Sequence, residues 1–239
     1  MAVSEEVRPE ANELLVSVAQ QLKVPLAIIA RHAELGGLAD GPGLDAATIA
    51  TQADAALLLV DSYLLGLELL RTQTQLELEP VSVSSLLVDA AHELHGFARQ
   101  YGVAVELETA GKYGPVMSNS RGLKAALLSL GFALVEAQAA GSEDVKPGRV
   151  LLAAHRTPHG IVAGMYGTTQ AVTADAWRRA QALCGKAGQP FTALGSASAG
   201  LFVADTILRS MDSRLRVGHY SHRGGLAATL QPSRQLQLV

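Results

Sequence analysis

The chain has little cysteine, few aromatic residues and few charged residues. Over 239 residues it has one cysteine, Cys184, with 4% aromatic and 17% charged residues. A single cysteine excludes an internal disulfide and a zinc site built from several cysteines, and we expect Cys184 to be a small buried apolar side chain. Because aromatic residues are scarce, aliphatic side chains and alanine must form the core. The hydrophobic fraction of 49% excludes a disordered chain and suffices for one or two folded domains.

A strong net charge and a membrane-length apolar run are also absent. The formal net charge is −3 with both signs scattered along the chain, which gives no electrostatic attraction to nucleic acid or anionic lipid. The longest apolar candidate, residues 125–135, is shorter than the roughly 18 residues of a transmembrane helix. The N-terminus is polar and acidic, unlike a secretory signal. We therefore expect a cytoplasmic protein with no membrane span and no nucleic-acid partner.

The first 75 residues have the pattern of a helical hairpin. In residues 10–35, apolar side chains recur at steps of three and four, which predicts an amphipathic helix. Pro25 interrupts this helix and predicts a kink, because an interior proline removes a backbone hydrogen bond. Glycine and proline at 36–43 predict a turn. A second helix is expected from near Asp45 to Thr72.

The second helix carries a heptad stripe that predicts self-association. Its apolar positions alternate steps of four and three, which is the spacing of a coiled-coil seam. A two-helix hairpin cannot cover this surface by itself, so we expect a homodimer with a four-helix bundle. The alternative is that the hairpin packs on the C-terminal domain of its own chain. The predicted dimer seam is Ile49, Ala53, Ala56, Val60, Tyr63, Leu67 and Leu70.

Residues 76–239 have a mixed pattern that predicts an α+β fold in two layers. Residues 73–80 look like a polar connector, and a loop containing Gly224 and Gly225 is expected between the last two strands. We expect helices at 82–101, 121–139, 175–186 and 199–211, and strands at 103–108, around 116, and at 149–154, 160–166, 214–220 and 226–231.

The order of these pieces, together with one short motif, resembles a bacterial sensor histidine kinase. The motif is Gln-Gln-Leu-Lys-Val-Pro-Leu at residues 20–26, followed by a return helix, a connector with Leu-Glu-Pro-Val at residues 78–81, and the α+β part. The resemblance implies a dimerisation and phosphotransfer hairpin at 1–75. It also implies a two-layer α/β sandwich of the ATP-binding type at 76–239.

At the phosphoacceptor position, this sequence departs from the family pattern. The family motif begins with a histidine that accepts the phosphoryl group and a glutamate that assists it, whereas this chain has Gln20 and Gln21. An amide nitrogen is a poor nucleophile because its lone pair is delocalised into the carbonyl, so neither glutamine can replace the histidine. The resemblance also implies where a response-regulator receiver domain docks, on the face formed by Gln20, Gln21, Lys23, Val24 and Pro25.

The nucleotide motifs of the family are changed as well. The asparagine that coordinates magnesium would fall at Phe132 or Ala133, and no aspartate or glutamate occurs from residue 145 to 174 to bind adenine. What remains of the pocket is a set of small or apolar residues, and we therefore expect no cofactor, with Mg·ATP binding weak or absent. These pocket remnants are Gly164, Gly167, Gly195, Gly200 and Leu201.

The sequence thus predicts a catalytically inactive, dimeric histidine kinase-like protein, a pseudokinase that binds a response regulator or a partner kinase. Three alternatives stay open. Gln20 or Gln21 could orient water in a receiver-directed phosphatase. His32 could be a relocated phosphoacceptor, or the kinase motifs could be aligned wrongly. His92 and His95 are three residues apart and do not match the zinc-binding His-x-x-x-His spacing.

Overall fold

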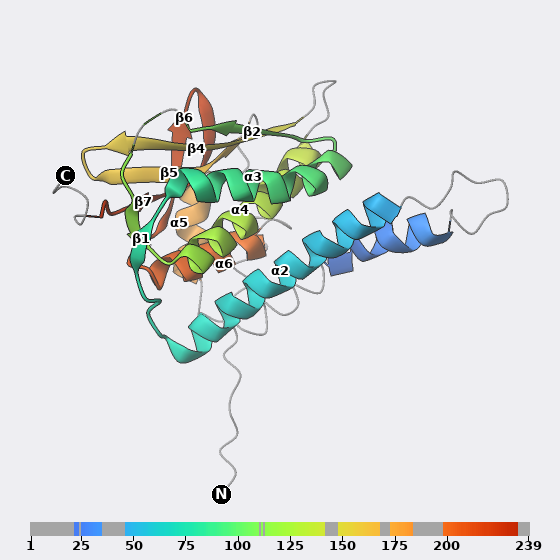
Figure 1. Ribbon diagram of the computed structural model, residues 1–239, viewed down its shortest axis with the longest axis horizontal. Coiled ribbons are helices and arrows are strands. Elements are labelled where there is room, and N and C mark those ends of the chain that lie inside the picture. The colour runs from blue at the N-terminus through green and yellow to red at the C-terminus, as the bar shows by residue number, and fades with distance from the viewer. Residues whose placement is uncertain are drawn as a thin grey trace, which may run out of the picture.

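The computed structural model describes residues 22, 23, 25–34, 46–109, 111, 113–141, 148–167, 173–183 and 198–233. Residues 22, 23 and 25–34 are helical and precede the labelled elements of Figure 1. The elements that follow are α2 (Ala46–Thr72), β1 (Glu79–Val81), α3 (Val83–Gln100), β2 (Ala104–Glu108), β3 (Val116–Ser118), α4 (Ser120–Gly141), β4 (Arg149–Thr157), β5 (Gly160–Gly167), α5 (Ala174–Leu183), α6 (Ser198–Arg209), β6 (Leu215–Tyr220) and β7 (Arg223–Leu230).

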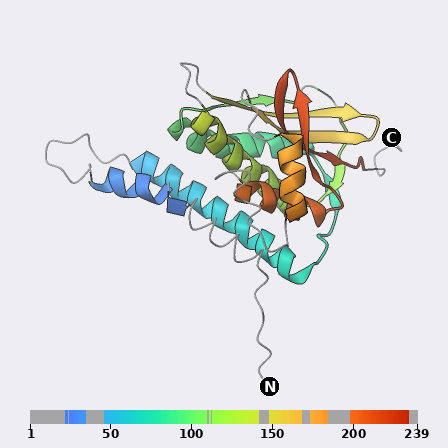
Figure 2. The same cartoon turned by 180° about the vertical axis from the view of Figure 1, so that it is seen from behind.

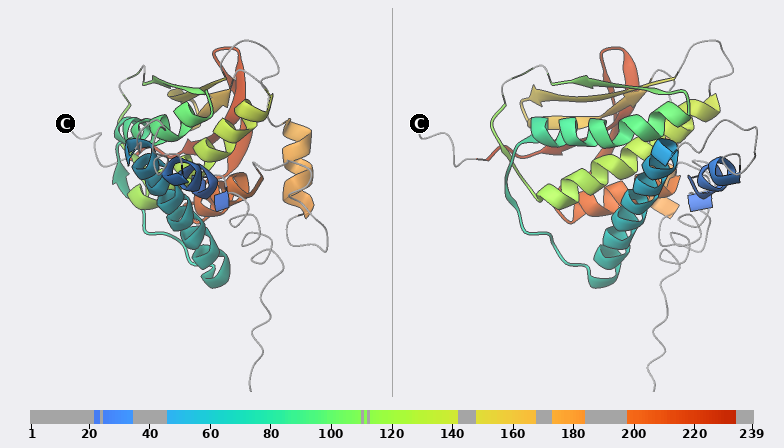
Figure 3. Two further views of the ribbon diagram at one scale, coloured as in Figure 1. Left: turned by 90° about the vertical axis from the view of Figure 1, so that its right-hand side faces the viewer. Right: turned by 45° about the vertical axis from the view of Figure 1, so that its right-hand side comes forward.

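The predicted α+β architecture is confirmed as a layer of helices on one face of a five-stranded sheet. The strand order is β2-β4-β5-β7-β6, and β1 pairs with β3 in a separate two-stranded sheet. Only β2 and β4 run parallel, which fits a connection through the long crossover helix α4. Helices α3, α4 and α6 lie against the same face, which we call the inner face, and α2 crosses beneath them (Figures 1, 2 and 3).

Helix α4 is the centre of the core. Its apolar side chains are buried on nearly all sides, between the sheet and helices α2, α3 and α6. Phe132 packs edge-to-face on Phe97 of α3, with 4.7 Å between ring centroids. Residues 120–139 are long and apolar enough to cross a membrane, but 72% of that window is buried inside the chain. The composition of α4 therefore reflects its position in the core.

Helix α2 packs on α4 and α6 of its own chain. The buried positions of α2 are Gln52, Ala55, Leu59, Ser62, Tyr63, Gly66 and Leu69. Gly66 allows the close approach, because a Cβ there would lie 3.2 Å from Val203 of α6. Tyr63, a predicted seam residue, is 1% exposed and belongs to this domain-facing side. The other six seam positions are half-buried, and the dimer itself remains a prediction.

Two expectations about local structure were wrong. Residues 79 and 80, assigned to the connector, belong to β1, with Glu79 opposite Ser118. Gly224 and Gly225 lie inside β7, and the turn between β6 and β7 consists of Ser221 and His222, both with positive φ. A Cβ on Gly225 would overlap the carbonyl oxygen of Met165, so β5 passes too close for any larger residue.

The tip of the β6–β7 hairpin reaches over the face of the sheet opposite the helices, which we call the outer face. The Tyr220 hydroxyl donates to Glu108 of β2 at 2.6 Å, and Arg223 pairs with Glu106 at 2.7 Å. Tyr220 also stacks on His155, at 5.1 Å between ring centroids. The hydrogen bond from Arg223 lowers the pKa of Glu106, and the bond to Glu108 raises the pKa of Tyr220 to about 12. The hairpin thus connects opposite edges of the sheet.

Candidate functional site

The N-terminal part of α6 packs directly on the middle of α4. Gly200 is buried, and a Cβ on it would lie 2.6 Å from the backbone oxygen of Ser129 and 3.1 Å from the Cβ of Ala133. Ala133 is fully buried, and Phe132 turns toward α3. Of the two residues that sequence analysis left open, Ala133 is therefore the one that faces α6. Leu201 is also fully buried.

Where α4 meets α6, the buried side chains facing the contact are small. Ala133 presents a methyl group, and the buried hydroxyl of Ser129 has no hydrogen-bond partner. Among the described residues, no group of three or more histidine, cysteine, aspartate or glutamate side chains could hold a metal ion.

Asp205 of α6 connects three elements, and sequence analysis missed it. Its side chain is 4% exposed and accepts hydrogen bonds from the backbone N–H of Leu215 at 3.0 Å and from the amide of Gln181 at 3.2 Å. It also pairs with Arg209 at 2.7 Å. Trp177 of α5 donates to the Leu215 carbonyl at 3.1 Å. The N–H and the carbonyl of Leu215, which point away from β7, thus both have a side-chain partner. These hydrogen bonds connect α5 and α6 to β6.

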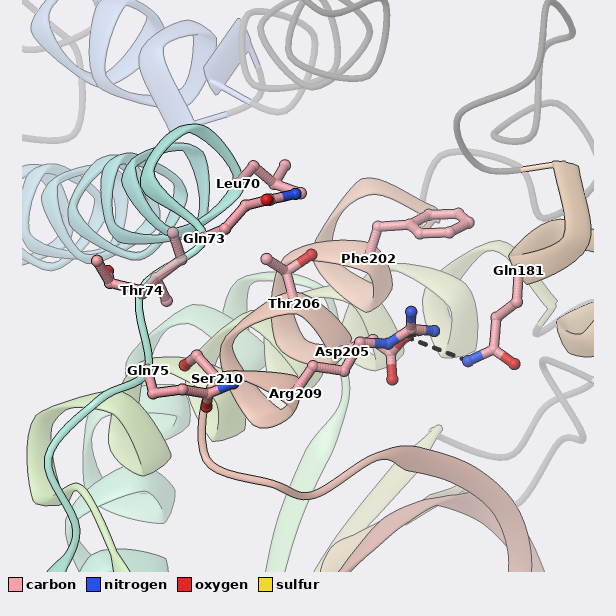
Figure 4. A pocket seen from close by; sticks show the side chains of 11 residues that line it. Leu70, Gln73, Thr74, Gln75, Gln181, Phe202, Asp205, Thr206, Arg209 and Ser210 are labelled. Atoms are coloured by element: carbon pink, nitrogen blue, oxygen red, sulfur yellow. Dashed lines mark hydrogen bonds and ion pairs between the residues drawn. The ribbon is translucent and has the colours of Figure 1, made fainter.

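A polar cavity of about 430 Å³ lies between the end of α2 and α6. Its side chains come from α2 and the following connector on one side and from α5 and α6 on the other (Figure 4). Most carry amide or hydroxyl groups, which suit small hydrogen-bonding ligands rather than covalent chemistry. The cavity is lined by Leu69, Leu70, Gln73, Thr74, Gln75, Gln181, Phe202, Asp205, Thr206, Arg209 and Ser210.

Gln73 closes the end of α2 in a conformation that favours glycine. Its φ is 53°, and its backbone N–H donates to the carbonyl of Leu69 at 2.9 Å, which is the pattern of a left-handed helix cap. A non-glycine residue in this region costs about 1 kcal/mol or more. The strained cap lies at the junction between the hairpin and the α+β part.

Replacing Gln73 by glycine is expected to stabilise the protein. Gln73→Gly should raise the free energy of unfolding by about 0.5–1 kcal/mol, because relief of the left-handed strain exceeds the added unfolded-state entropy. Urea denaturation measures the change. Gln75→Gly is the matched control in the same connector, where φ is not positive; it should leave stability unchanged or lower it. A lower midpoint for Gln73→Gly would show that its side chain stabilises the junction.

Solved structures share this arrangement, although no protein-family model and no curated protein sequence matches the chain. The Acinetobacter baumannii histidine kinase AdeS is 15% identical, with a TM-score of 0.51 over 89% of this chain and 97% of its own. Histidine kinase ThkA in complex with response regulator protein TrrA is 14% identical, with a TM-score of 0.52 over 92% of this chain and 61% of its own. This chain has the histidine kinase fold.

A third similar structure is full-length ShkA in complex with AMPPNP. It is 17% identical, with a TM-score of 0.54, and the match covers 95% of this chain and 47% of ShkA. The chain therefore spans about half the length of ShkA. At these identities the likeness extends to the histidine kinase fold and not to the individual functional residues.

The hairpin residues that the histidine kinase motif predicts are described only in part. Gln20, Gln21 and Val24 lie outside the described residues, as do the turn at 36–43 and Cys184. Of the two described members of the predicted docking face, Lys23 is exposed and Pro25 is buried. His32 is helical and half-buried. His92 and His95 are exposed on α3, as expected for a solvated helix face.

The predicted pocket remnants of the histidine kinase fold are separated in the structure. Gly164 lies in the middle of β5, where it pairs with Ala153 and Ala227, and a Cβ on it would overlap Ala227. Gly167 ends β5 opposite Gly224, and Gly195 lies outside the described residues. Gly164 therefore serves strand packing on the outer side. The contact between α4 and α6 retains Gly200.

Proposed function

We propose that this chain is a catalytically inactive member of the histidine kinase fold that acts in two-component signalling by binding a response-regulator receiver domain. The observation that carries the proposal is the contact of Gly200 with Ser129 and Ala133. The magnesium ligand of the family falls at Ala133, and a methyl group packed against a helix cannot coordinate a metal. The sequence adds the loss of the phosphoacceptor at Gln20 and of any acid in residues 145–174.

Binding is the function that the remaining features support. Lys23 is exposed on the helix whose motif corresponds to the docking face of the family. ThkA was solved in complex with a response regulator, which makes a receiver domain the reasonable partner for this chain; a partner kinase is the second choice. A cytoplasmic location follows as part of the same proposal.

Homodimerisation is part of the proposal, and the structure suggests a revised seam. Leu57 and Leu64 are 62% and 58% exposed, seven residues apart on the side of α2 that faces away from the α+β part. Large apolar side chains exposed at heptad spacing are typical of a helix with a missing partner. Leu57 and Leu64 interleave with Ala53, Val60 and Leu67, so the seam is expected to run along these positions and to exclude Tyr63.

The test mixes the full chain with receiver domains of the same organism and measures mass by light scattering. We expect a two-to-two complex with no acid-labile phosphate on this chain after incubation with Mg·ATP. Lys23→Glu should weaken receiver binding about tenfold, because it reverses a charge on the docking face. Arg71→Glu, an exposed control at the far end of α2, should leave affinity unchanged.

Three outcomes would overturn the proposal. Phosphate on the hairpin would show an active kinase, with His32→Ala locating a relocated acceptor. Faster loss of phosphate from a phosphorylated receiver would show that a glutamine at 20 or 21 activates water. Failure of every receiver domain to bind at 100-fold molar excess would remove the binding function.

A further inference from the structure

The outer face of the sheet has a hollow at the end away from the hairpin tip. This cavity of about 570 Å³ lies where β6 begins and β7 ends, beside the turn between β4 and β5. Its ionisable side chains are Arg214, Arg216, His159 and Asp212. The other polar residues of the lining are Thr157, Ser213, Thr229 and Gln231. The hollow is distinct from the contact of α4 with α6, which lies on the inner face.

Both arginines line this hollow. Residues two apart on a strand share a face, and Arg216 is paired with Ala227, which is buried on the outer face with Leu151 and Tyr166. Arg214 directly precedes β6, and its side chain lines the same hollow as that of Arg216. The hollow therefore has two arginines at the edge of the sheet.

The guanidinium groups of Arg214 and Arg216 are available to bind an anionic ligand. Both are exposed, and in the described part of the chain neither forms an ion pair. His159 lies exposed at the same hollow, while Asp212 is the one acid that lines it. The guanidinium group is planar and binds oxyanions through two parallel hydrogen bonds. Two such groups at one hollow can donate to both oxyanions of a ligand with two linked oxyanions, whereas a single small anion accepts fewer of these hydrogen bonds.

Protection of the β6 edge against pairing with another chain is an alternative role for Arg214 and Arg216, but the structure supports it less well. Charged residues on an edge strand commonly prevent it from pairing with another chain. At this part of β6, however, the outward N–H and carbonyl of Leu215 are already bonded to Asp205 and Trp177. The edge is therefore blocked at the residue between the two arginines, without any contribution from their charge.

We propose that Arg214 and Arg216, with His159, bind a diphosphate group at the outer face of the sheet. Free inorganic pyrophosphate and the diphosphate of a larger molecule share this chemistry. The proposal does not depend on the proposed receiver-binding function, which concerns the hairpin.

Titration calorimetry of the full chain with sodium pyrophosphate, in low salt and without divalent metal, tests the site. We expect saturable binding that the double variant Arg214→Gln/Arg216→Gln weakens at least tenfold. Arg156→Gln is the matched control. Arg156 is an exposed arginine on β4. Leu151, Ala153 and His155 alternate onto the outer face, so Arg156 lies on the other face, away from the hollow. It should bind as the unaltered chain does. Circular dichroism confirms that each variant is folded.

Orthophosphate and ADP distinguish the ligand. Orthophosphate should bind at least tenfold more weakly than pyrophosphate, and ADP binding that the double variant removes would show that a diphosphate within a larger molecule is accepted. Absence of pyrophosphate binding, equal weakening by Arg156→Gln, or equal affinity for orthophosphate would each overturn the proposal. Aggregation of the double variant with unchanged pyrophosphate binding would show that the arginines protect the strand edge.

Discussion

Titration of the chain with Mg·ATP is expected to show no saturation below about 1 mM, roughly a thousandfold weaker than a micromolar nucleotide site. The family pattern places a magnesium ligand at Phe132 or Ala133, of which Ala133 faces α6, and an acid for adenine at the end of β5. The sequence has neither residue. Each lost hydrogen bond to a charged group costs about 1.5–3 kcal/mol, so two losses account for a change from micromolar to millimolar.

Because α6 packs closely on α4, a single substitution is not expected to restore Mg·ATP binding. Ala133→Asn would add a polar side chain next to Gly200, whose Cβ position is already 3.1 Å from the Cβ of Ala133. We expect this variant to remain unable to bind Mg·ATP and to be less stable, because it buries an amide without room for its partners. ShkA, solved in complex with AMPPNP, serves as the positive control for the fluorescent-nucleotide titration. Saturation of the unaltered chain at low micromolar concentration would contradict the loss of the site.

Asp205→Ala is expected to lower the free energy of unfolding by about 3 kcal/mol. The substitution leaves the Leu215 N–H without its acceptor, at a cost of about 1–3 kcal/mol for a buried donor. It also removes the partner of Gln181 and of Arg209, and it leaves a gap where a buried carboxylate joined α5, α6 and β6. The exposed position of Arg209, whose side chain is 51% accessible, keeps its own contribution small.

Urea denaturation with a fixed slope measures this loss, and Asp175→Ala is the matched control. Asp175 pairs with Arg178 on α5, but both side chains are 74% exposed, so its removal should change stability by no more than about 0.5 kcal/mol. The stability of Asp205→Asn should lie between those of Asp205→Ala and Asp175→Ala, because an amide oxygen can still accept a hydrogen bond from the Leu215 N–H but carries no charge. Equal midpoints for Asp205→Ala and Asp175→Ala would show that the connection through Asp205 adds no stability.

Periodicity predicted helices such as α3 because they bury one face, whereas α4 was predicted from its long apolar run. The helix expected at 82–101 is observed as α3, with Ser82 as its N-cap and Tyr101 as its C-cap. The three-residue strand β1 was missed because it is too short to show alternation. Gly224 and Gly225 were assigned to a loop, since glycine usually marks a turn, but here it permits contact between neighbouring strands. Such a contact depends on tertiary packing, which no local pattern reports.

The candidate sites show a similar division. Neighbouring residues on a helix differ in direction by about 100°, so sequence analysis left Phe132 and Ala133 as alternatives, and the packing of α6 was needed to choose. Asp205 had a visible signal, a lone acid in an apolar helix with arginine four residues later, but its acceptance of the Leu215 N–H depends on how α6 meets β6. The alternation of Arg214 and Arg216 is visible in the sequence, whereas their proximity to His159 follows from the sheet order.

The strand order also determines when this protein can fold during synthesis. Strand β5 lies between β4 and β7, and β7 begins at Arg223, well after β5 ends at Gly167. The contacts of the hairpin tip with β2 join residues 112 and 117 positions apart. A nascent chain whose β7 is still held in the ribosomal tunnel has one side of β5 unpaired, and pairing at such long sequence separation is slow. The exposed edge of β5 is therefore a point at which a chaperone, or a second nascent chain, competes with β7.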